Sequence, residues 1–98
     1  AGISGRTAQA LSEKLSVVAK GKQVICITHL PQVAAMADKH FLIQKAVVGT
    51  KTISSIQGMN EEERVDELAR MLSGSEVTEA VLINAREMID YAKRYKGE

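Results

Sequence analysis

The sequence predicts an α/β fold built around one short buried strand. The first observation is an apolar run over residues 24–27 (VICI), which is followed by Thr28, His29 and then Pro31. Such a run is typical of a strand covered on both faces, as in a parallel sheet. Proline suits the first turn of a helix, so the strand ends before it. The second observation is that helical apolar periodicities flank the run, which gives the predicted order α-β-α-β-β-α-α.

The composition describes one small unit with an aliphatic core. The 98 residues are 45% hydrophobic and only 3% aromatic, and 13 basic residues oppose 12 acidic ones. A net charge of +1 gives no electrostatic footprint for nucleic acid or an anionic membrane surface. The single cysteine, Cys26, excludes an internal disulfide and suits a reducing compartment. No apolar run is long enough for a transmembrane helix, so we expect a cytoplasmic protein without membrane contact.

The first predicted helix covers residues 6–20. Its apolar stripe recurs at helical spacing, and Gly21 is the expected C-terminal stop. The stripe consists of Ala8, Leu11, Leu15 and Val18. The link after Gly21 is short, so the predicted strand, residues 23–28, should lie directly against this helix.

A short helix and a hairpin follow the strand. The helix starts at Pro31 and ends near Ala37. Residues 40–48 and 51–57 read as two strands joined by a turn at Gly49-Thr50. Lysines at positions 45 and 51 interrupt the apolar pattern, which is typical of a sheet edge.

Two helices complete the chain. Asn60 is the predicted N-cap of the first, with Glu63 in capping-box position, and Gly74 ends it. Ser75 is the predicted N-cap of the second, whose wide apolar face indicates packing on two sides or a missing neighbour.

Two places in the sequence are candidates for chemistry. His29, at a strand-to-helix corner, could contact a phosphate or act as a general acid or base, or it could be a packed histidine bonded to a carbonyl. The glycine-serine stretch 2–5 could cradle a phosphate, although such a stretch before a helix is usually only a capped turn. It lacks the Walker A lysine and spacing. A zinc site from Cys26, His29 and His40 is not expected, because a fourth ligand is missing.

Three stretches resemble one family. Residues 1–8 (AGISGRTA), 24–34 (VICITHLPQVA) and 67–78 (ELARMLSGSEVT) resemble the C-terminal part of the bacterial RecN family, DNA double-strand-break repair ATPases related to SMC and ABC-type ATPases. The Thr-His corner is common to ABC-type ATPases, but its combination with the other two stretches is specific. The resemblance implies that residues 1–98 are the C-terminal part of an ABC-type P-loop ATPase head, with a partial parallel sheet, an edge hairpin and flanking helices.

The resemblance also implies roles for particular residues. Residues 1–5 match the D-loop, so that Gly2, Ser4 and Gly5 would face a nucleotide held by a partner head. Residues 28–32 match the switch-histidine loop, in which His29 senses the γ-phosphate and Thr28 lies beside it. The implied cofactors of the parent protein are ATP and Mg²⁺. The implied partners are the N-terminal part of the same head, a second head in a homodimer, and DNA in a nucleoid-associated, cytoplasmic setting.

The chain departs from the family pattern by lacking Walker A, Walker B and signature motifs. The family's Walker B acidic pair and D-loop aspartate would lie just before Ala1. We therefore expect a fragment that self-associates, holds no bound cofactor and does not hydrolyse ATP alone. The alternative is a non-catalytic interaction module that docks through its sheet edge and its last helix.

Overall fold

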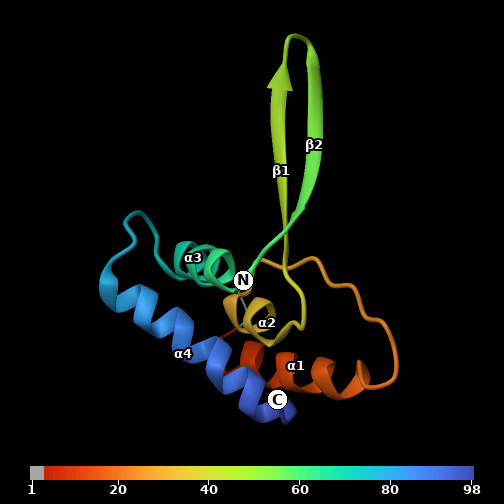
Figure 1. Ribbon diagram of the computed structural model, residues 1–98, viewed down its shortest axis with the longest axis vertical. Helices are drawn as coiled ribbons and strands as arrows, with labels where there is room; N and C mark the ends of the chain where they lie inside the picture. The colour runs from red at the N-terminus through yellow and green to blue at the C-terminus, as the bar shows by residue number, and fades with distance from the viewer. Residues whose placement is uncertain (1–3) are drawn as a thin grey trace.

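The computed structural model describes residues 4–98 as four helices and one β-hairpin. The order is α1 (Gly5–Val18), α2 (Pro31–Met36), β1 (Phe41–Val48), β2 (Lys51–Gly58), α3 (Glu61–Leu72) and α4 (Glu79–Lys96). The helices form one body with α2 at its centre, and the hairpin projects away from it (Figure 1). No helix in this described part is long and apolar enough to cross a membrane.

The core lies among α2, α3 and α4. Helix α2 packs against α1, α3 and α4, and α3 packs against α4. The buried residues of the main cluster are small or aliphatic: Ala34, Ala35, Val65, Leu68, Ala69, Ala85 and Ile89. Alanines on facing helices allow close approach of the backbones, so this body holds together without a central sheet.

The hairpin forms as predicted. β1 and β2 pair antiparallel from Phe41↔Gly58 to Val48↔Lys51, and Gly49 has a φ of +65°. Positive φ at the first of two loop residues is the pattern of a type II′ turn, which glycine adopts without strain. The strands bury almost nothing within residues 4–98, since every residue of β2 is exposed.

The predicted strand over residues 23–28 is wrong for this chain. The segment has no regular secondary structure and runs as a long connection between α1 and α2 (Figure 1). Ile25 is 83% exposed and Ile27 is 87% exposed. A strand of this composition requires neighbours that pair with it and cover both faces. The one sheet in the described residues is the hairpin, whose strands pair with each other, so the observed order is α-α-β-β-α-α and no parallel sheet is present.

The apolar stripe of α1 is also only partly buried. Ala8 and Ser12 are buried, whereas Leu11 and Val18 are exposed. Helix α1 therefore contacts α2 through its small residues, and the Ser12 hydroxyl is satisfied by donating to the Gln9 carbonyl at 2.7 Å. The larger aliphatic residues are uncovered because the strand that was expected to pack on them does not form.

The helix starts of α3 and α4 show one confirmed and one wrong prediction. Asn60 and Glu63 form the capping box, each side chain accepting from the other's backbone N–H at 2.9 Å. The N-cap of α4 is Thr78 and not Ser75, because the Thr78 hydroxyl accepts from the Val81 N–H at 3.2 Å. Both residue types cap well, so sequence alone did not separate them.

We predict that Asn60→Ala lowers the free energy of unfolding of the 98-residue chain by about 1 kcal/mol, because the hydrogen bond from the Glu63 N–H to the Asn60 side chain is lost. Urea unfolding followed by circular dichroism measures this. Asn84→Ala is the matched control, since Asn84 is exposed in the interior of α4. Equal stabilities of the two variants would contradict the role given to the cap.

Candidate functional site

The Thr28-His29 corner lies at the start of α2. The Thr28 hydroxyl accepts a hydrogen bond from the Leu30 N–H at 2.9 Å, which closes a tight turn around His29. Leu30 is the N-cap of α2 and Pro31 is its first residue, as predicted from the proline. The side chain of His29 is exposed. The loop thus presents an imidazole to solvent from a backbone that the turn and the proline constrain.

The start of α1 lies close to the same loop. Ser4 is the N-cap of α1, and its hydroxyl accepts from the Thr7 N–H at 3.2 Å and donates to the Thr7 hydroxyl at 3.0 Å. A Cβ placed on Gly5 would lie 3.5 Å from Nε2 of Gln32. The structure therefore brings Gly5 and the loop of residues 28–32 together. Gly2 lies outside the described residues.

The C-terminus of α2 is held by a buried arginine. Arg64 of α3 is only 6% exposed, and one of its terminal nitrogens donates to the carbonyls of Ala34, Ala35 and Ala37 at 3.3, 3.4 and 2.9 Å. The last carbonyls of any helix have no N–H donor farther along the same helix. Arg64 supplies a donor to these carbonyls from another helix. A positive charge at this end also complements the helix dipole.

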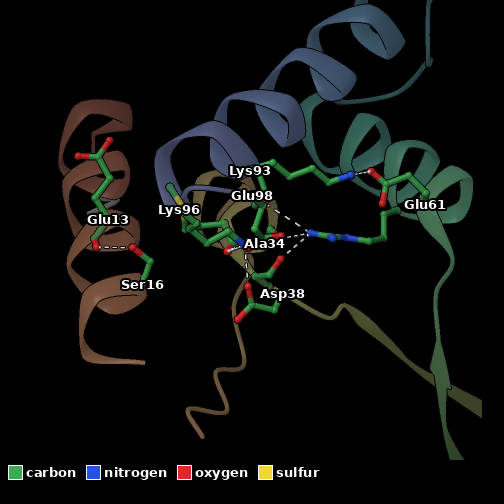
Figure 2. A network of polar contacts seen from close by, with 12 residues as sticks. Glu13, Ser16, Ala34, Asp38, Glu61, Lys93, Lys96 and Glu98 are labelled. Carbon is green, nitrogen blue, oxygen red and sulfur yellow. Dashed lines mark hydrogen bonds and ion pairs between the residues drawn. The ribbon is translucent and has the colours of Figure 1, made fainter. Parts of the chain in front are cut away.

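A lysine from α4 completes the same end of α2. Lys96 donates to the Met36 carbonyl and to the Asp38 carboxylate, both at 2.8 Å (Figure 2). About one turn before Lys96 in α4, Lys93 donates to Glu61 at 2.6 Å and so links α4 to the first turn of α3. We call Arg64 and Lys96, with the carbonyls they contact, the cationic clamp of α2.

Two ionisable groups beside the clamp, Asp38 and His40, have lowered pKa values. The hydrogen bond from Lys96 is the main cause that lowers the pKa of Asp38 below its ordinary value. Burial lowers the pKa of His40, and the nearby positive charge of Arg64 lowers it further, against an opposing effect of Glu67. The neutral imidazole of His40 is therefore the form that the folded chain prefers beside the clamp.

Sequence reasoning missed both residues of the clamp. It assigned neither Arg64 nor Lys96 a contact with the short helix that starts at Pro31. Their contacts join residues 27 to 60 positions apart in the chain. No local pattern reports such contacts, although an arginine one turn inside an amphipathic helix, among apolar positions, was a usable signal.

The described candidate residues lie at the starts of α1 and α2. His29 is exposed, the Thr28 hydroxyl holds the turn before α2, and Ser4 caps the start of α1. Among residues 4–98 no group of three or more His, Cys, Asp or Glu side chains is placed to hold a metal ion.

Comparison with known proteins identifies the class. No protein-family model matches the chain. It is 47% identical over 95 residues to the DNA repair protein RecN of Halalkalibacterium halodurans and 45% identical over 95 residues to that of Bacillus subtilis. The RecN of Treponema pallidum is 41% identical over 98 residues. These matches cover 97 to 99% of the chain but only 16 to 17% of each relative's length.

All three relatives are bacterial proteins that are named as DNA repair proteins. The class of protein to which this segment of helices and a hairpin is similar is therefore that of DNA repair proteins. The chain belongs to the RecN family and corresponds to its C-terminal segment. The resemblance that residues 1–8, 24–34 and 67–78 indicated is confirmed.

We predict that part of the chain's stability is lost as the pH falls below about 6.5, the ordinary pKa of histidine. His40 has a lowered pKa in the folded state, so its contribution is complete above the unfolded-state pKa and disappears as the pH falls through the folded value. The urea midpoint should therefore fall between pH 7.5 and pH 5.5, and His40→Gln should reduce that fall. His29→Gln is the matched control, since His29 is exposed, and an equal effect of both substitutions would contradict this assignment.

Proposed function

We propose that this chain is the part of a RecN-type ATPase that supplies the D-loop and the γ-phosphate-sensing histidine to an ATP site between two heads, in DNA double-strand-break repair and recombination. The observation that carries the proposal is the exposed His29, held at the start of α2 by the Thr28 turn and by Pro31. The names of the relatives support the repair context.

His29 would act by donating a hydrogen bond to an oxygen of the γ-phosphate. Bound Mg-ATP supplies the phosphoryl group on which negative charge is redistributed during transfer. A donor fixed in advance stabilises that charge without reorganisation at the moment of reaction. Thr28 contributes by holding the turn, because its hydroxyl already accepts from the Leu30 N–H.

The D-loop assignment involves Gly2, Ser4 and Gly5. Ser4 is engaged in capping α1, so its side chain supports the loop conformation in addition to any contact across the head interface. The approach of Gly5 to Gln32 supports coupling between the D-loop and the switch-histidine loop, because these two segments lie against each other. A nucleotide that reached one segment would lie near the other.

The partners follow from what the chain leaves uncovered. Ile25 and Ile27 are exposed together with Leu11 and Val18 of α1, and burying such side chains contributes about 1.5–3 kcal/mol each. We propose that the N-terminal part of the same head covers them and pairs with residues 23–28. A second head and DNA would engage the complete protein, in the cytoplasm and on the nucleoid.

The second candidate function is that of an interaction module without catalysis. The hairpin favours it, since Ile43, Val47, Ile53 and Ile56 are exposed on a projecting ribbon. The two functions differ in their dependence on His29: docking through the hairpin would not require the imidazole, whereas phosphate sensing would.

We predict that His29→Ala in the full-length protein reduces kcat for ATP hydrolysis on the order of 10²-fold, because one preorganised donor to the developing charge is lost. DNA binding measured by fluorescence anisotropy should change by less than about threefold, since His29 is assigned to phosphate and not to DNA. Thr50→Ala, at the tip of the hairpin, is the control and should keep wild-type turnover. Unchanged hydrolysis by His29→Ala would remove the sensing role.

We also predict that the isolated 98-residue chain shows no steady-state ATP hydrolysis above that of its own His29→Ala variant. The sequence contains no Walker A lysine in the spacing that holds the phosphates of ATP. A coupled phosphate-release assay on chromatographically pure chain measures this. Turnover that His29→Ala abolishes would contradict the division of the site proposed here.

A further inference from the structure

The position of helix α2 depends on the groups that hold its ends. The helix has six residues, which is too short for a stable helix on its own in water. Its N-terminus has no side-chain cap, because Leu30 is the N-cap residue. Its C-terminus is contacted by Arg64 and Lys96 from two other helices. The groups at the C-terminal end therefore act together with the packing of the buried α2 residues to fix where the helix lies.

Arg64 makes the more constraining of the two contacts. A single terminal nitrogen lies within 3.4 Å of three carbonyls, those of Ala34, Ala35 and Ala37. Carbonyls at these positions lie on different sides of the helix end, so one donor shared among them restricts both the rotation and the axial position of α2. Lys96 contacts one α2 carbonyl, that of Met36, and its other partners are the exposed carboxylates of Asp38 and Glu98.

The burial of Arg64 supports a specific role. Its Nε is buried and has no hydrogen-bond partner in residues 4–98. A buried guanidinium that leaves a donor unpaired costs free energy, which the contacts to the helix end must offset. An apolar residue of similar length would avoid this cost, but it would take the donor away from the carbonyls at the end of α2.

The two ends of α2 are mechanically connected. Pro31 and Met36 are five positions apart in the helix, which corresponds to about 7.5 Å at a rise of 1.5 Å per residue. A displacement or rotation of the C-terminal carbonyls therefore moves Pro31, and with it the turn at Thr28 and His29. Movement of a donor by about 1 Å can cost on the order of 10²-fold in rate.

We propose that Arg64 is a positioning residue for His29: its contact with the C-terminal carbonyls of α2 fixes the helix that carries the phosphate-sensing loop. This inference rests on the proposed function of His29. It adds a dependence on α3, an element that contributes none of the candidate site residues.

The test is a double-mutant cycle for ATP hydrolysis in the full-length protein, numbered as in this chain. Arg64→Met should lower kcat about 10- to 100-fold with little change in KM for ATP. In a His29→Ala background the same substitution should have almost no further effect, because the group that it positions is absent. Damage to the fold in general would lower kcat in both backgrounds, and that outcome would overturn the proposal.

Two further variants keep the test decisive. Arg64→Lys retains a cation and should restore part of kcat, and it replaces Arg64→Met in the cycle if the latter does not fold. Arg86→Met is the matched control, since Arg86 is exposed on α4. Wild-type kcat for both Arg64 variants, together with a loss of kcat in His29→Ala, would overturn the positioning role alone. Unchanged kcat in His29→Ala would instead overturn the proposed function on which it rests.

Discussion

Two cations from separate helices close the C-terminus of α2, and the arrangement of the helical body depends on that contact. Arg64 of α3 and Lys96 of α4 donate to the last carbonyls of α2, which no residue of α2 itself satisfies completely. Because α2 packs against each of the other three helices, fixing it also fixes their relation to one another. The loop that carries His29 leaves the other end of this short helix, so the same contact reaches the candidate site.

The uncovered apolar residues give the structure its second constraint. The segment 23–28 has the composition of a central strand and yet lies exposed, and the exposed side of α1 carries Leu11 and Val18. Four helices can bury small residues such as Ala34, Ala69 and Ala85 against one another without a sheet. They cannot cover β-branched residues that project from a connecting segment. This contrast agrees with a chain that spans only 16 to 17% of its relatives' length.

Features fixed by local chemistry could be predicted from the sequence, and features fixed by distant contacts could not. The capping box at Asn60, the helix start at Pro31 and the turn at Gly49 each depend on residues within four positions, and the structure confirms them. A strand over residues 23–28 would need paired and covering neighbours, which residues 4–98 do not supply, so the prediction failed. In the site, the position of Thr28 and His29 just before the start of α2 was predictable from the proline, whereas Arg64 reaches α2 across 27 to 30 positions of sequence.

The central claim is that His29, held by α2, completes an ATP site that other parts of a larger protein build. A structure of the full-length protein with a non-hydrolysable ATP analogue and Mg²⁺ tests it most directly. We expect residues 23–28 to pair as a strand, Arg64 to remain on the α2 carbonyls, and an imidazole nitrogen of His29 to lie about 2.6–3.2 Å from a γ-phosphate oxygen. An unpaired segment 23–28 with His29 turned away from the bound nucleotide would contradict the account.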